Sequence, residues 1–595
     1  TMHIERLYRK AGRSFEFCYN IQTSEPLLLA ELEKLFWLLS ETFEPQLLGA
    51  NSFLVSEGVV EVGPRMNFVT PWSTNAVAIC HACGLDKVLR IERSRRYITP
   101  EGVDPDYDRM TECIYPVPLG TFESSISSEE VFQVDLLGRG INALKDINDK
   151  MGLGMDDWDM DFYYNLFVHD FKRNPTDVEC FQLGQANSEH SRHWFFKGKQ
   201  VINGVVKEES LMDIVRSTLR PYSNSVVAGD NSSAIYGAVI TTIHPGFPGK
   251  HSSFKKGASL YHITFTAESH NHPTGIAPFP GAGTGVGGML RDLQAIGSGG
   301  LIMVVTAGYC TDNLLIPGYE LPWEKKETRA SKLASPLEII IQASNGASDY
   351  GNKFGKPLIQ GFTRSFGLRT PDGRRAWVKP VMFVGGVGQV NDAHTKKAEP
   401  EKGMLIVQIG GPAYRVGVGG GGASSMVYGE NKIELDFNSV QRGDPEMQQK
   451  LDRVIRACIE LGPLNPILSI HDQGAGGPCN VDTELANPAG AKIRIRNINS
   501  GDPSLSVKEI WGGEYQERNA LLIHPEQLAS FQKICDRENV SCENLGEITG
   551  DGRIVVYDDA DGTMPVDLEL KKILGEMPQK TFRDEKEETV KKPLS

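Results

Sequence analysis

The stretch ESHNHPTGIAPFPGAGTGVGGMLRD, residues 268–292, combines histidines, carboxylates and closely spaced glycines. Glu268 and Asp292 offer hard oxygen ligands, which suit Mg²⁺ because this cation favours a few carboxylates together with substrate phosphates. Asp472 follows the apolar run ILSI, where a strand is expected to end, and strand ends of this kind bind ligands in α/β sheets. The three acids together predict a magnesium site.

The glycines between Gly281 and Gly288 indicate phosphate binding, because backbone amides can approach a phosphate closely where no Cβ intervenes. The segment GTGVGG also matches the dinucleotide pattern G-x-G-x-x-G, which is informative only between a strand and a helix. Three prolines precede it, and proline removes the donor that a central strand requires. The sequence therefore predicts a Gly-rich loop that holds phosphate in a less common way.

Histidines and arginines supply groups that can move protons and bind phosphate. An imidazole titrates near neutral pH, so it can accept or donate a proton during catalysis. His190 and His193 lie in NSEHSRH, where a continued helix would place them about one turn apart on one face. A helix-capping role is the simpler alternative for a lone histidine, and the spacing does not match the zinc pattern H-E-x-x-H. Arg291 and Arg442 can provide planar guanidinium groups for phosphate oxygens.

Composition divides the chain into segments that must position these residues. The expected segments are an accessory α/β domain at 1–132, a helical linker at 133–203, a first core unit with the Gly-rich loop at 204–400, a second α/β core unit at 401–575 and a charged tail at 576–595. Alternating β-rich and helical runs indicate the first domain, and a Lys- and Glu-rich seam marks the boundary near residue 400. In the linker, Thr176 and Glu179 have the spacing of a capping box. The expected fold class is α/β (α+β).

Composition also limits the class of protein. The chain has 595 residues, too many for one core, so three or four domains are expected. Its net charge of −14 disfavours a nucleic-acid-binding module, which would carry a basic surface. No apolar run reaches the roughly 18 residues of a membrane span, and the first residues lack the apolar core of a signal peptide. The ten scattered cysteines, with the single pair Cys80 and Cys83, fit a reducing cytoplasm better than a zinc site.

Six long segments occur in one order along the chain: QANSEHSRHWFFKG, FTAESHNHPTGIAPFPGAGTGVGGMLRD, QASNGASDYGNKFG, VQRGDPEM, IHDQGAGG and EIWGGEYQE. In this order they resemble the phosphoribosylformylglycinamidine synthase family, and the resemblance covers essentially the whole chain. It implies an accessory domain, a linker that reaches the active site, and one half of a duplicated core. That half-core, two α/β units, resembles the aminoimidazole ribonucleotide synthetase superfamily.

The resemblance implies a ligase of purine biosynthesis that forms a C–N bond with glutamine as the amido donor. In this family, ATP phosphorylates the amide oxygen of formylglycinamide ribonucleotide, and ammonia from glutamine then displaces phosphate to give the amidine. ATP and Mg²⁺ are the implied nucleotide and cofactor. We expect a cytoplasmic protein with small-molecule substrates and with neither a nucleic-acid nor a membrane partner.

The motif matches assign roles to individual residues. The catalytic positions are His190 and His270, of which His270 matches a proposed proton acceptor. The metal positions are Glu268, Asp292 and Asp472. The nucleotide-binding positions are Gly281, Ala282, Gly283, Thr284, Gly285, Val286, Gly287, Gly288, Met289, Leu290, Arg291, Asp292, Gln360, Gly361, Phe362 and His193. The substrate-contacting positions are Ser269, His270, Asn271, His272, Arg291, Gln441, Glu514, Tyr515 and Gln516. The segment Gly281–Asp292 matches both an active and an auxiliary nucleotide site, and the sequence does not rank the two.

Two alternatives remain open at this point. The family has a second core half and a C-terminal glutaminase that are not among these residues, and none of the ten cysteines lies in a nucleophile-elbow context. The chain can therefore be an incomplete fragment or split subunit that acts only with these parts in cis or in trans. A related ATP-dependent synthetase is the other alternative, although it would not need the linker motif. We expect the isolated chain to be inactive and to self-associate through an exposed apolar face.

Overall fold

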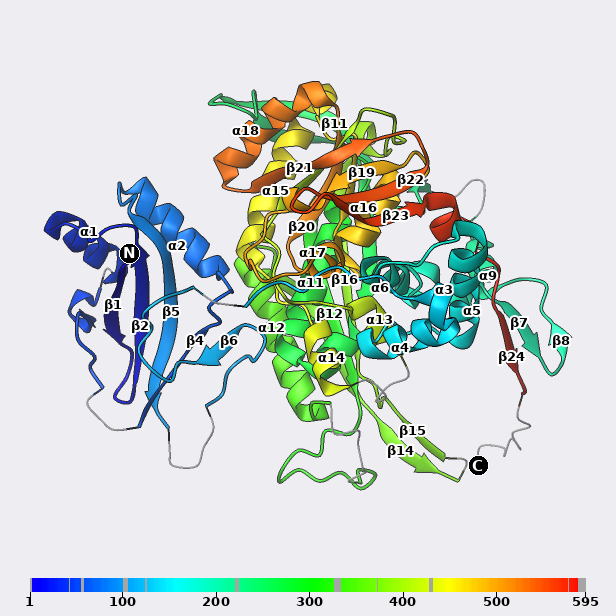
Figure 1. Cartoon of the computed structure of the whole chain (residues 1–595), viewed down its shortest axis with the longest axis horizontal. Helices are drawn as coiled ribbons and strands as arrows, with labels where there is room; N and C mark the ends of the chain where they lie inside the picture. Colours follow the sequence, from blue (N-terminus) through cyan, green and yellow to red (C-terminus); the bar gives the residue numbers. More distant parts are fainter. Residues whose placement is uncertain are drawn as a thin grey trace. The chain divides into compact units, whose positions relative to one another are not determined.

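The protein forms two compact units, described here from a computed structural model (Figure 1). The structure describes residues 3–41, 43–54, 58–99, 105–123, 126–219, 224–325, 333–371, 373–426, 432–575 and 577–586. The first unit comprises residues 1–129 with the short segments 413–415 and 500–506, and the second unit comprises the remaining residues. No helix within the described ranges is both long enough and apolar enough to cross a bilayer.

The first unit is a six-stranded sheet with two helices. In sheet order its strands are β3 (Leu48–Gly49), β1 (His3–Lys10), β2 (Phe15–Thr23), β5 (Val88–Ile98), β4 (Val59–Pro64) and β6 (Glu112–Ile114). The helices are α1 (Leu29–Leu39) and α2 (Pro71–Ala82). Ile21 and Ile91 of the sheet pack with Leu35 of α1 in one buried cluster. The leucine spacing that predicts α1 thus reflects a core-facing helix.

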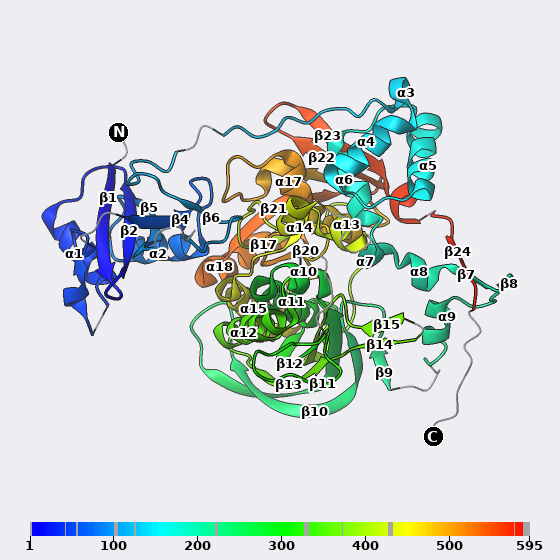
Figure 2. The same cartoon turned by 90° about the horizontal axis from the view of Figure 1, so that it is seen from below.

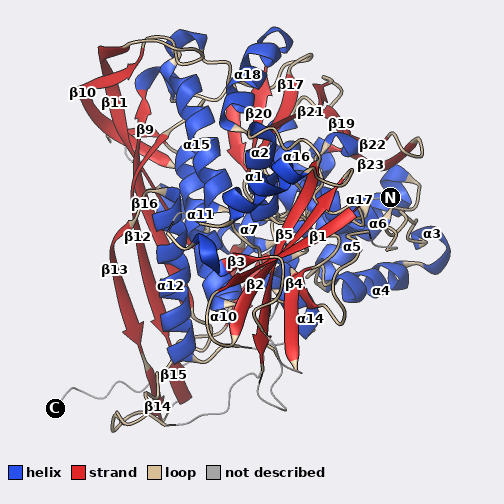
Figure 3. Cartoon of the chain, turned by 90° about the vertical axis from the view of Figure 1, so that its left-hand side faces the viewer, coloured by secondary structure: helices blue, strands red, loops and turns tan. Residues whose placement is uncertain are grey.

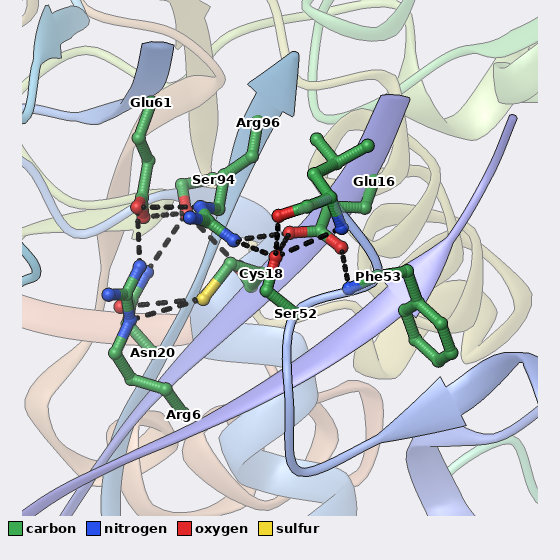
Figure 4. A network of polar contacts seen from close by, with 10 residues as sticks. Arg6, Glu16, Cys18, Asn20, Ser52, Phe53, Glu61, Ser94 and Arg96 are labelled. Carbon is green, nitrogen blue, oxygen red and sulfur yellow. Dashed lines mark hydrogen bonds and ion pairs between the residues drawn. The ribbon is translucent and has the colours of Figure 1, made fainter. Parts of the chain in front are cut away.

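The opposite face of this sheet is polar, because side chains alternate between the two faces of a strand (Figure 4). Arg6 contacts Glu61, and Arg96 contacts both Glu16 and Glu61. Ser94 Oγ donates to Glu61 Oε1 over 2.6 Å. Each carboxylate in this largely buried network therefore has several partners, which is the condition under which buried charges are tolerated.

Within the described residues the second unit contains two small sheets and two large ones. The small sheets are β14 (Gly367–Thr370) with β15 (Gly373–Ala376), and β24 (Thr581–Asp584) with β7 (Lys199–Ile202) and β8 (Val205–Val206). The first large sheet carries Glu268 near the end of one of its strands. In sheet order its strands are β13 (Leu358–Ser365), β12 (Leu301–Thr311), β16 (Val381–Asn391), β11 (Phe254–Ser269), β10 (Ser233–Pro245) and β9 (Ser225–Val227). Helices α11 (Pro278–Gln294) and α12 (Pro336–Phe354) lie along one face of this sheet (Figure 3). Met289 and Leu293 of α11 pack with Ala347 of α12 and with Val384 of β16.

The predicted Gly-rich loop is wrong, because residues 281–288 form the middle of α11. Amides inside a helix are bonded to carbonyls one turn earlier, so they are not available to surround a phosphate. The glycines instead allow close packing. A Cβ on Gly281 would lie 2.5 Å from the carbonyl of Pro273, and a Cβ on Gly346 of α12 would lie 2.0 Å from the carbonyl oxygen of Phe279. Tertiary packing thus overrides the low helix propensity of glycine.

The second sheet has seven strands and helices on both faces. In order they are β18 (Ser469–Asp472), β20 (Arg518–Ile523), β17 (Leu405–Gly410), β21 (Ser541–Ile548), β19 (Ala491–Arg494), β22 (Arg553–Asp558) and β23 (Thr563–Glu569). Helices α15 (Pro445–Glu460) and α18 (Leu528–Glu538) pack on it through Val454 and Phe531. Ala295, which follows α11, is buried in the same cluster, so the two sheets share a packed boundary.

The linker segment is helical (Figure 2). Its helices are α3 (Leu136–Arg139), α4 (Ile141–Met151), α5 (Asp157–Asn165), the π-helix η2 (Leu166–Phe171), α6 (Asp177–Ala186), α7 (Glu189–Arg192) and α8 (Trp194–Lys197). The capping box at the start of α6 is confirmed: Thr176 Oγ1 accepts from the Glu179 amide, and Glu179 Oε2 accepts from the Thr176 amide, both over 3.0 Å. This cap fixes the direction of α6, at whose end the chain turns into α7.

The close approach of α11 and α12 generates a stability prediction. We expect Gly346→Ala to lower the thermal midpoint by roughly 2–10 °C, because overpacking of this kind costs about 1–3 kcal/mol. Gly249→Ala is the control, since a Cβ at that position meets nothing within 4 Å. Thermal unfolding followed by circular dichroism measures both. Equal midpoints for the two variants would contradict the packing argument.

Candidate functional site

One cavity in the second unit brings most of the predicted residues together. It lies among α7, the end of β11, the short helix α10 (Asn271–Ile276), α11, the short helix α13 (Gly420–Ser425) and the end of β18. The predicted residues that line it are His190, Glu268, Ser269, His270, Asn271, His272, Thr284, Gly288, Arg291, Asp292, Gln441, Asp472, Glu514 and Gln516. Five sequence-distant motifs therefore share one space.

Three carboxylates form one wall of the cavity. Glu268 is the penultimate residue of β11, Asp292 lies in the last turn of α11, and Asp472 ends β18. Burial, followed by the charge of Asp472, raises the pKa of Glu268 to about 7. Burial and the charges of Asp472 and Glu268 raise the pKa of Asp292 well above its usual value. Mutual repulsion of this kind is relieved when a cation binds.

The oxygen donors fit the type of ligand that Mg²⁺ prefers. A Cβ on Gly288 would lie 2.9 Å from Glu268 Oε2, so α11 leaves room for this carboxylate to face the cavity. Within the described ranges, no group of three or more His, Cys, Asp or Glu residues is already arranged to hold a metal ion. The assignment of Glu268, Asp292 and Asp472 to a metal therefore stays a prediction.

His270 presents a free acceptor to the same cavity. Its Nδ1 faces the carbonyl oxygen of Gly281, and because a carbonyl only accepts, Nδ1 must carry the proton. Nε2 is then the unprotonated nitrogen. Burial lowers the pKa of His270 to about 4, so the ring is neutral at physiological pH. A Cβ on Gly285 would lie 2.9 Å from His270 Cβ, so this glycine of α11 also makes room for a site residue.

His190 and His193 do not share a face, in contrast to the sequence prediction. His190 Nε2 lies 2.8 Å from Ser424 Oγ of α13, and this hydroxyl donates to the Gly420 carbonyl over 2.7 Å. His193 ends α7 in the left-handed conformation, with φ of 53°, and it does not line the cavity. The helix stops at His193, so the one-turn spacing does not apply. Burial lowers the pKa of His190, which favours its neutral form.

Glu514 organises the wall opposite the carboxylates. Its Oε1 accepts from the amides of Gly421 and Gly476 over 3.0 and 2.9 Å, and its Oε2 accepts from Gln441 Nε2 over 2.8 Å. Gln516 in turn donates to Gln441, and its own Oε1 has no partner within the described part of the chain. Tyr515, predicted to contact substrate, points away and donates to the carbonyl of Ile510. Successive side chains of an extended segment point to opposite sides, so Tyr515 points away from the cavity that Glu514 and Gln516 line.

Arg291 is the strongest candidate for binding an anion. It is completely buried, and its Nη1 donates to Gln448 Oε1 over 3.1 Å and lies 3.7 Å from Glu517 Oε1. Its Nε and Nη2 have no partner within the described residues, although Arg291 lines the cavity. A planar guanidinium with two free donors suits a phosphate or carboxylate group.

Other predicted residues lie away from the cavity. Gln360, Gly361 and Phe362 belong to the edge strand β13, and the ring of Phe362 stacks 6.3 Å from that of Phe383. Met382 and Val384 face the helices, so their neighbour Phe383 must face the other side of the sheet. These three nucleotide-binding predictions are therefore not brought to the cavity. Arg442 donates to the carbonyls of Val440 and Gln441 and does not line the cavity.

Two residues that no motif predicts, Asn231 and Lys397, lie behind the carboxylate wall. Asn231 Nδ2 donates to Asp472 Oδ1 over 2.6 Å, and Asn231 Oδ1 accepts from Lys397 over 2.9 Å. Asn231 lies in GDNSS, which matches no motif, and Lys397 lies in the seam that the composition marked only as a boundary. The asparagine follows an aspartate in a turn, which is the single local signal that was present.

Comparison with family models matches three parts of the chain. Residues 16–118 match formylglycinamide ribonucleotide amidotransferase N-terminal, residues 144–193 match the formylglycinamide ribonucleotide amidotransferase linker domain, and residues 401–559 match AIR synthase related protein, C-terminal domain. The three matches follow the chain order expected from the motifs.

Curated relatives match over nearly the whole chain. The probable phosphoribosylformylglycinamidine synthase, chloroplastic/mitochondrial, of Arabidopsis thaliana is 51% identical over 97% of this chain and 44% of its own length. The Homo sapiens phosphoribosylformylglycinamidine synthase is 46% identical over 98% of this chain and 46% of its own length. A solved structure described as T. maritima PurL complexed with FGAR aligns with a TM-score of 0.48 and 20% identity, covering 72% of this chain and 57% of its own. This chain therefore spans less than half the length of these curated relatives.

Thermal stability distinguishes an acid that is repelled by its neighbours from an acid that forms an ion pair. We expect Asp292→Asn to leave the thermal midpoint unchanged or to raise it in the presence of a chelator, because it removes one of three mutually repelling charges. Asp230→Asn is the matched control: it removes the ion-pair partner of Lys397, and breaking a buried pair costs about 3–5 kcal/mol. A large loss of stability in Asp292→Asn would show that Asp292 is structural.

Proposed function

The chain belongs to the phosphoribosylformylglycinamidine synthase family, and we propose that its cavity is part of the site that amidates formylglycinamide ribonucleotide with ATP and glutamine-derived ammonia. One observation carries the proposal: a neutral histidine, three carboxylates and a buried arginine, two of whose nitrogens have no partner among the described residues, face the same space. Proton transfer, anion binding and cation binding are the three tasks that this reaction requires. The chain spans 44% of the length of the Arabidopsis thaliana relative, and the complete activity is proposed for a protein that also has the remaining parts.

The reaction has two chemical steps. In the first, the γ-phosphoryl group of ATP is transferred to the amide oxygen of the substrate, and ADP leaves. In the second, ammonia forms a C–N bond to the activated carbon, and phosphate leaves with the electrons of the C–O bond. Both steps place negative charge on phosphoryl oxygens, which positioned cations and arginines stabilise.

Arg291 is proposed to bind the phosphate oxygens through its free Nε and Nη2. Its third contact, Nη1 to Gln448 Oε1, holds the guanidinium plane in place. Mg²⁺ held by Glu268, Asp292 and Asp472 would neutralise charge on the phosphoryl group. Gln516 Oε1, which is buried without a partner in the described part of the chain, can accept a hydrogen bond from the substrate.

His270 is proposed as the proton acceptor for the second step. Addition of ammonia to carbon produces a positively charged nitrogen that must lose a proton before phosphate can leave with the product neutral. The unprotonated Nε2 of His270 is available because Nδ1 is committed to the Gly281 carbonyl. His190, held by Ser424 on the linker side, is the second candidate for this role.

The remaining parts of the enzyme are proposed to cover an exposed sheet face. The face opposite α11 and α12 carries Ile263 and Phe265, which are 44% and 43% exposed. Val387 and Phe362 of the neighbouring strands are exposed as well. Contiguous apolar surface of this kind marks an interface. We propose that the second core half packs there, and that a glutaminase domain supplies ammonia in cis or in trans.

Two further assignments remain proposals. We propose that the protein acts in the cytoplasm, although the name of the Arabidopsis thaliana relative places that protein in the chloroplast or mitochondrion. A split subunit that acts only with a partner chain is the alternative to a single long polypeptide. The intact mass of the native protein distinguishes the two.

The proposed acid–base role predicts a selective loss of turnover. In the complete enzyme, His270→Ala should lower kcat by about 10² to 10⁴ with ammonia as donor, while the KM for the ribonucleotide changes little. His190→Ala should act in the same direction. His251→Ala is the control, because His251 is exposed and does not line the cavity. Near-normal turnover in His270→Ala would remove it from the mechanism.

The exposed sheet face predicts association of the isolated chain. The 595-residue chain should self-associate, and Ile263→Lys should shift it toward monomer by placing a charge in the apolar face. Met564→Lys is the control, since Met564 of β23 is comparably exposed but lies on the other sheet. Sedimentation velocity at several concentrations measures the state. A monomeric unmodified chain that synthesises the amidine alone would overturn the proposal that this half is incomplete.

A further inference from the structure

A chain of polar contacts connects the metal-type carboxylates to the seam between the two sheets. Asn231 precedes β10, and its Nδ2 lies 2.6 Å from Asp472 Oδ1 and 3.4 Å from Asp292 Oδ1. One amide group therefore reaches a carboxylate from each of the two sheet units. Lys397 lies in the segment that connects the two large sheets, and its Nζ is 2.9 Å from Asn231 Oδ1.

The orientation of this amide is determined by its partners. A lysine ammonium group can only donate hydrogen bonds, so Asn231 must present its oxygen to Lys397. Its NH₂ group then has to face Asp472 and Asp292, which accept. If the amide were flipped, its NH₂ group would face the Lys397 ammonium, and its oxygen would face the carboxylate oxygens. Neither pair could form a hydrogen bond. Lys397 thus sets the direction in which Asn231 donates.

Lys397 is itself fixed on its other side. Its Nζ contacts Asp230 Oδ1, and Asp230 Oδ2 accepts from the Gly297 amide over 2.8 Å. The same turn is tied to α11, because Ser232 Oγ donates to the carbonyl oxygen of Asp292 over 3.1 Å. The side chain of Asn231 is therefore held against the carboxylates by two sets of contacts. Lys397 binds it from one side, and the neighbouring residues Asp230 and Ser232 are bound to the end of α11 and the turn that follows it.

We propose that Asn231, oriented by Lys397, is a positioning residue that holds Asp292 and Asp472 in place for cation binding. It is not a ligand, because it does not line the cavity and its oxygen faces the lysine ammonium. Hydrogen bonds to ligating carboxylates fix their orientation, and removing such a partner typically costs about 10- to 100-fold in metal affinity. This inference rests on the proposed function of the cavity.

Mn²⁺ binding to the 595-residue chain tests the inference directly. Electron paramagnetic resonance reports free Mn²⁺, so it gives the affinity without an activity assay. Asn231→Leu keeps the size of the side chain and removes the amide, and we expect its Mn²⁺ affinity to fall about 10- to 100-fold. Lys397→Arg retains a donor for both Asp230 and Asn231, and it should keep an affinity close to that of the unmodified chain.

Asn465→Leu is the matched control. Asn465 is also half-buried and also donates through Nδ2, to the Ser298 carbonyl over 3.0 Å, but it does not line the cavity or touch the three carboxylates. Its substitution should leave Mn²⁺ affinity within about twofold. Thermal unfolding verifies that each variant is folded. If Asn231→Leu does not fold, Asn231→Ser takes its place, since a hydroxyl cannot span both carboxylates, and the same loss is expected.

The outcomes separate this inference from the proposed function. Mn²⁺ binding that is lost in Asp292→Asn and weakened in Asn231→Leu, but unchanged in Asn465→Leu, supports both. Binding that is lost in Asp292→Asn and unchanged in a folded Asn231 variant overturns the positioning role alone. Absence of Mn²⁺ binding to the unmodified chain overturns the proposed metal site and the positioning role with it.

Discussion

The site depends on how closely α11 can approach its neighbours. A helix with ordinary side chains at positions 285 and 288 would push away the imidazole of His270 and the carboxylate of Glu268, since the missing Cβ atoms would lie 2.9 Å from each. The same helix approaches α12 through glycine on both sides. Glycine in a helix interior costs about 1 kcal/mol relative to alanine. The buried cluster around Met289 and Leu293 offsets that cost, so packing energy is what holds a glycine-rich helix beside the site.

This packing has an electrostatic consequence. It brings Glu268 from a strand end and Asp292 from the last turn of a helix beside Asp472, which comes from the other sheet, and it buries all three in part. Burial raises the pKa of all three, and the charge of Asp472 raises the pKa values of Glu268 and Asp292 further. The surrounding cations oppose this only partly: Arg291 is already shared with Glu517, and Lys397 is paired with Asp230. A divalent cation in this cavity would therefore be favoured by charge as well as by ligand type.

The sequence predicted the members of the site better than their arrangement. Long motifs predicted residues such as His270 and Asp292, which line the cavity, because identity over many positions carries family information that local pattern does not. The capping box at Thr176 was predictable because it depends only on residues three apart. The helical state of the glycines was not predictable from local propensity, since it depends on α12, some 60 positions along the chain. His193 was misplaced for a related reason: whether a helix continues past one turn is decided by what the next residues pack against.

Asn231 and Lys397 could not be predicted from the sequence one residue at a time. Neither lies in a recognisable motif, and their role follows only from being placed behind carboxylates that two different sheets supply. The two sheets meet at a packed boundary that includes Ala295 and Leu301, so a shift of one sheet relative to the other would separate Asp472 from Asp292. Asn231 donates toward both acids and is bound by Lys397, so it opposes such a shift beside the two carboxylates. The geometry of the cavity therefore depends on how the two large sheets pack against each other.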